Sequence, residues 1–253
     1  MDPCGENALK LNCDLGESYG AWQMGNDEAV MPLIDMANVA CGFHASDPNI
    51  MVRTVQLAAR HGVEIGAHPA YFDLYGFGRR SIPHTADEIH ALIWYQVGAL
   101  DGICRAHGQR IAYVKPHGAL NNDMMQDPAI LEAVMRAVHG YDPDLPLMIP
   151  VTRFHDSHRA VAREIGVPLL LEAFADRAYD NDGQLVSRKL EGAVHHDQTR
   201  IVDQARSFAE RGGVFSVEQQ WLDLPADSLC VHGDNPESLA AVKAIREALG
   251  QAA

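Results

Sequence analysis

Short apolar runs alternate with longer amphipathic stretches along nearly the whole chain, and this alternation limits the folds that the chain can adopt. The runs that read as buried strands cover residues 9–13, 36–41, 63–67, 111–114, 145–150, 168–171 and 228–231. The stretches with helical spacing cover residues 47–61, 85–107, 127–139, 153–165, 195–211 and 236–249. Strands that alternate with helices form βαβ units, and near-continuous apolar strands indicate a parallel sheet covered on both faces.

The number of expected strands favours a closed barrel over an open sheet. Seven strands in 253 residues predict a single α/β domain over 1–253, a TIM-like (β/α) barrel. No Pro/Gly/Ser-rich linker divides the chain. Residues 212–221 fit one further short strand, and Thr85 with Glu88 forms the capping-box pattern at the start of a helix.

The composition excludes several classes of partner. The chain has 34 acidic and 20 basic residues, a net charge of −14, which argues against nucleic acid and anionic membrane surfaces. No apolar run reaches the roughly 18 residues of a membrane helix, and no signal peptide is visible. The five cysteines show no CxxC spacing, and Cys13, Cys41 and Cys230 are expected as core thiols. Together these features predict a cytoplasmic protein.

Titratable side chains follow the expected strands where each strand ends. In NVACGFHASDP, residues 38–48, a strand runs directly into His44 and then into Asp47 and Pro48, which read as a helix start. The carboxyl ends of parallel barrel strands meet on one face, where active sites of such barrels are built. We therefore expect one site formed from Asp14, Glu17, His44, His68, Lys115, His117, Glu172, Asp176, Arg177, His232 and Asp234.

Each of these residues also has a structural interpretation. A histidine at a strand end can bond a loop carbonyl, and Asp47 or Asp234 can cap a helix. The glycine-rich loop 67–83 is either a packed loop with surface arginines or a lid in which Arg79 contacts an anion. The remaining histidines are expected on the surface: His61, His84, His90, His107, His139, His155, His158, His195 and His196.

The motifs of common cofactor and nucleophile sites are absent from the sequence. It contains no P-loop, dinucleotide fingerprint, HExxH, CxxC or GxSxG. Two histidines and one carboxylate at neighbouring strand ends can hold a catalytic metal, so Asp14, His44 and His68 are a candidate site for a divalent ion of undetermined identity.

Several long stretches resemble the LamB/YcsF family, which is also known as the family of 5-oxoprolinase A subunits. They are LNCDLGESYG, NVACGFHASDP, GAHPAYFDLYGFGRR, VKPHGAL, EAFADRAY, LVSR and CVHGDNP, and they run from about residue 10 to 236. The resemblance implies a seven-stranded barrel related to glycoside hydrolase and deacetylase barrels. It also implies ATP-dependent opening of the 5-oxo-L-proline lactam to L-glutamate, with companion subunits B and C. Asn121-Asn122 departs from the Tyr-Asn that is usual in the family, which bears on which lactam fits.

Lactam hydrolysis assigns hypothetical roles to these residues. Asp14 or Glu17 would be the general base, and His44 or His68 would position water or protonate the leaving nitrogen. Lys115 would stabilise negative charge, with His117 in the same catalytic set, and Arg79 or Arg177 would hold the substrate carboxylate. Glu172, His232 and Asp234 would complete the substrate site.

The sequence leaves several alternatives open. Because it has no nucleotide motif, the co-substrate ATP binds either through an unfamiliar surface or on a companion subunit. A metal-dependent amide or carbohydrate deacetylase and a non-catalytic lactam-binding subunit remain alternatives. The oligomeric state, including a homo-oligomer, is also open.

Overall fold

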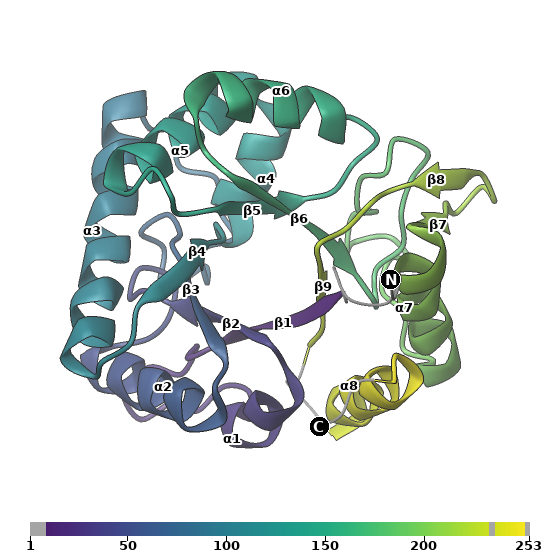
Figure 1. Ribbon diagram of the computed structural model, residues 1–253, viewed down its shortest axis with the longest axis horizontal. Helices are drawn as coiled ribbons and strands as arrows, with labels where there is room; N and C mark the ends of the chain where they lie inside the picture. Colours follow the sequence, from purple (N-terminus) through teal and green to yellow (C-terminus); the bar gives the residue numbers. More distant parts are fainter. Residues whose placement is uncertain (1–8, 233–235, 251–253) are drawn as a thin grey trace, which may run out of the picture.

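The strands close into a barrel, as the sequence predicts (Figure 1). The computed structural model describes residues 9–232 and 236–250, and within this part seven parallel strands form the closed sheet. The strands follow the chain order around the barrel: β1 Lys10–Leu15, β2 Met36–Ala40, β3 Glu64–His68, β4 Ile111–Val114, β5 Leu147–Pro150, β6 Leu169–Phe174 and β9 Ser228–Cys230. Each predicted strand is confirmed to within a few residues.

Helices form the outer layer around this sheet (Figure 1). They are α1 Asp27–Val30, the 3-10 helix η1 Met31–Leu33, α2 Pro48–His61, α3 Ala86–Ala106, α4 Gly118–Gln126, α5 Pro128–Tyr141, α6 His155–Ile165, α7 Gln198–Arg211 and α8 Pro236–Ala248. The predicted helices are present, but α4 was not predicted, because it is only nine residues long and buries only three side chains. Across 9–232 and 236–250, every helix is too short or too polar to cross a bilayer.

Local sequence signals account for two of the helix starts. Asp47 Oδ1 accepts hydrogen bonds from the backbone N–H groups of Asn49 and Ile50, at 2.8 and 3.1 Å, so its predicted capping role is confirmed. Thr85 and Glu88 form the predicted capping box at the start of α3. The strand expected within 212–221 is also present, as β7 Gly213–Phe215, which pairs antiparallel with β8 Trp221–Asp223.

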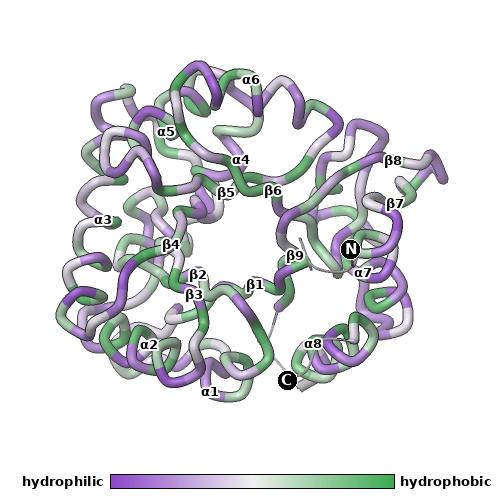
Figure 2. The backbone as a smooth tube through the Cα atoms, in the orientation of Figure 1, coloured by the Kyte–Doolittle hydropathy of each residue, from purple (hydrophilic) through white to green (hydrophobic). Residues whose placement is uncertain are grey.

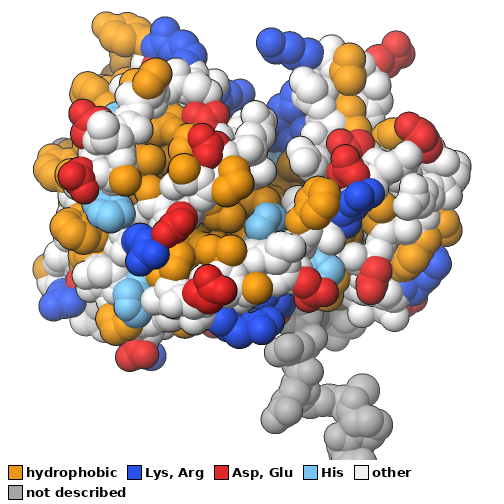
Figure 3. Space-filling model, turned by 90° about the horizontal axis from the view of Figure 1, so that it is seen from above, with side chains coloured by type: hydrophobic (Ala, Val, Ile, Leu, Met, Phe, Trp, Pro, Cys, Tyr) orange, Lys and Arg blue, Asp and Glu red, His pale blue; other side chains and the backbone are white. Residues whose placement is uncertain are grey.

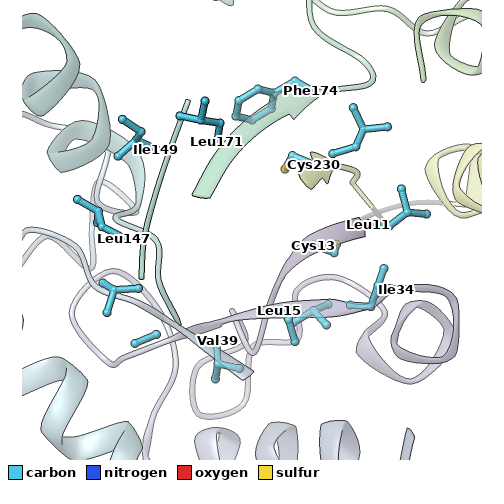
Figure 4. Packing of buried hydrophobic residues seen from close by; sticks show 14 of the residues in the cluster. Leu11, Cys13, Leu15, Ile34, Val39, Leu147, Ile149, Leu171, Phe174 and Cys230 are labelled. Atoms are coloured by element: carbon cyan, nitrogen blue, oxygen red, sulfur yellow. The ribbon is translucent and has the colours of Figure 1, made fainter. Parts of the chain in front are cut away.

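The alternation of side chains along each strand separates an outer core from a barrel interior. Figure 2 shows hydrophobic residues concentrated on the barrel strands and mixed with hydrophilic ones on the surrounding helices. Leu147 and Ile149 lie on the outer side of β5, towards the helices (Figure 4). Met148, between them, faces the opposite side and packs with Met36 and Tyr113 in a separate apolar cluster inside the barrel.

The cysteines of the described part are core residues. Cys13, Cys41, Cys104 and Cys230 are buried and form no disulfide there. Burial raises the pKa of Cys41 and of Cys104 to about 12, so both thiols stay protonated and unreactive at neutral pH. This agrees with the expectation from their spacing.

Gly66 on β3 has no side chain, and the ring of Tyr113 fills the space that this leaves inside the barrel. The two residues are paired in neighbouring strands, and a Cβ atom at Gly66 would overlap the Tyr113 ring. Gly66→Ala should therefore lower the free energy of unfolding by about 1–3 kcal/mol, the usual cost of overpacking. Urea denaturation measures this change.

Gly102 is the matched control, since it lies inside α3 and an added Cβ would meet nothing within 4 Å. Gly102→Ala should be neutral or stabilise the protein by up to about 1 kcal/mol. Equal effects of the two substitutions would contradict the close packing of Gly66 on Tyr113.

Candidate active site

A buried ammonium group lies inside the barrel at its carboxyl-terminal end. Lys115, the residue after β4, places Nζ 3.0 Å from Asp14 Oδ1 and 2.7 Å from Glu172 Oε1. Its partners come from β1 and β6, so the ion pairs cross the barrel. The Lys115 side chain is 6% exposed and that of Glu172 is 1% exposed. The sequence places all three residues at strand ends, and the structure brings their side chains into contact.

The ion pairs determine the charge states of Lys115 and Asp14. Burial opposes charge on Lys115, but the Asp14 and Glu172 carboxylates outweigh it and hold the pKa of Lys115 well above its usual range. Burial likewise opposes charge on Asp14, yet His68 and Lys115 hold the pKa of Asp14 well below its usual range. At neutral pH Lys115 is therefore cationic and Asp14 anionic.

Amide side chains deeper in the barrel hydrogen-bond to the Asp14 carboxylate and to one another. Asn38 Nδ2 donates to Asp14 Oδ1 and to Asn12 Oδ1, both at 2.8 Å. The hydroxyl of Tyr113 donates to Asn38 Oδ1 at 2.6 Å. Asn12 and Asn38 are not among the site residues expected from the sequence. Both are amides at inward positions of otherwise apolar strands, and this pattern could have indicated a polar site inside the barrel.

Three histidines and a glutamate gather beside Asp14. His44 follows β2, His68 ends β3, His117 precedes α4, and Glu17 lies in the loop after β1. The rings of His44 and His117 are stacked, with centroids 3.7 Å apart and planes within 6°. Nε2 of His44 lies 3.1 Å from Glu17 Oε1.

Main-chain carbonyl groups fix the tautomers of two of these rings. His68 Nδ1 lies 2.6 Å from the Lys115 carbonyl oxygen, and His117 Nε2 lies 2.9 Å from the Phe77 carbonyl oxygen. Because a carbonyl only accepts, both of these nitrogens carry hydrogen. The remaining nitrogens, His68 Nε2 and His117 Nδ1, then face each other at 3.0 Å with a lone pair each. Such a contact is favourable only when a cation or a proton lies between the two lone pairs.

The donor set fits a divalent metal ion. One ligand atom from each of Glu17, His44, His68 and His117 lies within 4.8 Å of the others. Burial, with the neighbouring histidines, lowers the pKa of His44 well below its usual range and that of His117 to about 3. Neutral imidazoles with one carboxylate suit Zn²⁺ and similar borderline ions, and carbonyl-anchored rings are typical of metal ligands.

This set differs from the expected Asp14, His44 and His68. His44 and His68 are in it, whereas Glu17 and His117 replace Asp14, which is paired with Lys115. The sequence could not distinguish Asp14 from Glu17, because both follow the same strand and the loop conformation decides which one reaches His44.

The loop after β3 covers the histidines through its backbone. Gly78 has φ +63°, and an added Cβ would lie 2.8 Å from both His117 Cδ2 and His44 Cβ. Its carbonyl accepts from the Ala119 N–H at 2.8 Å. Phe77, with φ +54°, adopts a backbone conformation that is rare for a residue with a side chain. The glycine-rich loop, whether packed loop or lid, thus packs directly on the candidate site.

The arginines proposed for the substrate carboxylate have different surroundings. Arg79 is exposed, and its guanidinium lies 5.1 Å from the centroid of the Phe77 ring. The neighbouring Arg80 pairs with Asp73. Arg177 is buried and donates to the carbonyls of Val186 and Ala193, so it holds its own loop. A substrate contact by either arginine stays a prediction, and Arg79 is the more accessible.

The remaining expected residues lie on the other side of the barrel mouth. His232 follows β9 and contacts Asp176, which follows β6. Asp234 lies outside the described residues. His195 was expected on the surface, which is wrong, since it is only 5% exposed within the segment that connects β6 to α7. Asn121, where the sequence departs from the family, lies in the first turn of α4.

Charged side chains of both signs are mixed on the side of the molecule that Figure 3 shows. Figure 3 shows Lys and Arg side chains interspersed with Asp and Glu over the face that it presents. No continuous basic patch is visible on this face among the described residues.

Removal of the Lys115 charge should lower the stability of the protein. Lys115→Met leaves Asp14 and Glu172 without their cation, so we expect a loss of about 3–5 kcal/mol in the free energy of unfolding. The double variant with Glu172→Gln should recover part of this loss, because one carboxylate is neutralised. Chemical denaturation of the three proteins measures both effects.

Lys10 provides the matched control, since it forms an exposed ion pair with Glu64. Lys10→Met should cost less than about 1 kcal/mol. A similar cost at both lysines, or no recovery in the double variant, would contradict the charge balance described for Lys115.

The histidine cluster should bind Zn²⁺. His117→Ala should weaken Zn²⁺ binding by more than about tenfold, whereas His61→Ala, at the exposed end of α2, should leave it unchanged. Because the pKa of His117 is lowered to about 3, binding should persist below the ordinary histidine pKa of about 6.5. Calorimetric titration of metal-free protein tests this, and wild-type affinity in His117→Ala would exclude the site.

Comparison with known proteins gives relatives over nearly the full chain. A model of the LamB/YcsF family matches residues 9–253. A protein of Chromohalobacter salexigens, named as the A subunit of 5-oxoprolinase, is 59% identical over 94% of this chain and 95% of its own. One of the same name from Pseudomonas fluorescens is 60% identical over 96% and 97%. The crystal structure of a lactam utilization protein from Thermus thermophilus has 38% identity and a TM-score of 0.89, covering 96% of both chains. This chain belongs to the LamB/YcsF family.

Proposed function

We propose that this chain is the A subunit of an ATP-dependent 5-oxoprolinase, which opens the lactam of 5-oxo-L-proline to give L-glutamate. The relatives that share more than half of its residues are named as A subunits of 5-oxoprolinase. The observation that carries the chemistry is the contact between a charged pair, Asp14 and Lys115, and the histidine cluster at one barrel mouth. A hydrolase needs both a proton acceptor and a stabiliser of negative charge at the reacting carbonyl.

The residues around the lactam carbonyl have distinct tasks in this proposal. Asp14 is ionised and its Oδ2 lies 3.4 Å from His68 Nε2, so it is placed to accept the proton of the attacking water. Lys115 stays protonated and stabilises the negative charge that develops on the carbonyl oxygen. Glu17, His44, His68 and His117 would hold the metal, which supplies Lewis-acid chemistry when bound.

ATP and the companion subunits enter as co-substrate and partners. A lactam amide is stabilised by resonance, and phosphorylation of its oxygen by ATP would activate the carbonyl for attack. The sequence has no nucleotide-binding motif, so we place the ATP site on one of the companions, B or C. The described cysteines are free thiols, as is usual in a reducing compartment, and we place the complex in the cytoplasm.

Reconstitution tests this function. The purified chain with companion subunits B and C should form glutamate from 5-oxoproline and ATP. Asp14→Asn in the same mixture should reduce the rate by about 10²–10⁴-fold, because the proton acceptor is lost. Near-normal turnover of this variant would remove Asp14 from the chemistry.

The alternative functions give different results in the same assay. Hydrolysis of acetylated amides or sugars without ATP, and no glutamate from 5-oxoproline, would indicate a metal-dependent deacetylase. A loss of 5-oxoproline affinity with unchanged turnover at saturation, in variants of Asp14 and Lys115 alike, would indicate a binding subunit. Loss of turnover at saturating substrate supports the enzyme.

A further inference from the structure

A second histidine environment lies across the mouth from the metal cluster. Asn12 of β1 pairs with Cys230 of β9, which pairs with Phe174 of β6. Two residues further along these three strands come Asp14, His232 and Asp176. Asn12, Cys230 and Phe174 face the barrel interior, since Lys115 Nζ contacts all three. His232 therefore follows the strand that lies between the strand of Asp14, the proposed proton acceptor, and the strand that precedes Asp176.

Asp176 holds His232 in a defined orientation. Asp176 Oδ2 lies 2.8 Å from Nδ1 of His232. This contact directs Nε2, on the opposite side of the ring, away from the carboxylate. A carboxylate in contact with one imidazole nitrogen fixes the ring and favours its protonated form.

His232 is open to a cavity, unlike the histidines of the metal cluster. Its side chain is 21% exposed, whereas those of His44 and His68 are 0% and 1% exposed. The cavity has a volume of about 580 Å³ and is also lined by Asp176 and Arg188. Asp14 and Lys115 are not among its lining residues, so the cavity gives the His232 ring a path to solvent apart from the charged pair.

The charges around His232 favour a proton on its ring. Burial opposes the charge, but Asp176, with a smaller effect of Asp14, raises the pKa of His232 above its usual value against the repulsion of Arg188. His195, His196 and Glu237 are the other titratable residues that line this cavity. The strand-end histidines are thus divided: the pKa values of His44 and His117 are lowered, whereas that of His232 is raised, which favours the proton on its ring.

We propose that His232, oriented by Asp176, is the general acid that protonates the ring nitrogen as the lactam C–N bond breaks. The inference rests on the proposed function and deepens it. Water adds its oxygen to the carbonyl carbon and gives a proton to Asp14. The electron pair of the C–N bond stays on nitrogen, which takes the proton of His232 Nε2 and leaves as the amine of glutamate. His232 regains a proton from solvent through the cavity.

This acid decides which bond of the activated substrate breaks. Once the oxygen carries a phosphoryl group from ATP, the adduct with water can expel either phosphate or the ring nitrogen. Expulsion of phosphate regenerates the lactam and consumes ATP without product. Expulsion of nitrogen requires a proton and leads, through an acyl phosphate that water hydrolyses, to glutamate and phosphate. His232 therefore couples ATP consumption to ring opening.

The test measures glutamate and phosphate together in the complex reconstituted from this chain and its B and C companions. His232→Gln should reduce glutamate formation by about 10²-fold or more, while phosphate release falls less, so that the ratio of phosphate to glutamate rises. His61→Gln, at the exposed end of α2, should leave both rates and their ratio unchanged. Zn²⁺ binding and thermal melting of each variant report that the barrel is intact.

Asp176→Asn tests the positioning role separately. It should move the alkaline limb of the pH–rate profile to lower pH, because the loss of the carboxylate lowers the pKa of His232. A merely structural role would lower the rate without moving the limb. This second variant decides the question if His232→Gln melts early.

The outcomes separate the inference from the function on which it rests. No glutamate from the wild-type complex would overturn the proposed function. An active wild type with His232→Gln within about threefold of it would overturn the inference alone. An equal fall of glutamate and phosphate in His232→Gln, with an unmoved pH limb in Asp176→Asn, would also overturn it.

Discussion

The ammonium group of Lys115 is the interaction on which the arrangement of the site depends. Its side chain crosses the barrel from the end of β4 to carboxylates on β1 and β6, and its main-chain carbonyl fixes the ring of His68. Lys115 therefore links its own ion pairs inside the barrel to the histidine cluster that contains His68. Burying a charge is costly unless it is paired and hydrogen-bonded, so the positions of Asp14, Glu172 and the amides around them follow from the presence of this cation.

The barrel interior changes in polarity along its axis. An apolar cluster that contains Met148 lies at one level, amides such as Asn38 follow, and charged groups stand at the mouth. Across the mouth, the pKa of His117 is lowered to about 3, whereas that of His232 is raised. A small amide substrate held between them would meet a Lewis-acid side and a proton-donating side, which is what opening a C–N bond requires.

The sequence predicts the fold well and the site in part. Alternation of apolar runs and amphipathic stretches specified the barrel, because burial on both faces leaves few other choices. Strand ends identified Lys115 and His68, since strand direction alone places them at the mouth. Two other features depend on loop conformation. Glu17 rather than Asp14 is the neighbour of His44, and Arg177 donates to loop carbonyls. Such choices depend on packing between segments far apart in sequence, which no local pattern records.

The contact between Phe77 and His117 has a consequence for how this loop can change during evolution. The group that His117 meets is a main-chain carbonyl, which every amino acid supplies. The side chain at position 77 does not set this tautomer, and a substitution there would instead change the edge-to-face contacts that its ring makes with His44 and His117. The stricter restriction falls on the next residue, Gly78, where an added Cβ would lie 2.8 Å from side-chain atoms of both His44 and His117. New specificities can thus arise on the outer surface of the loop while its inner surface stays fixed by a residue that has no side chain.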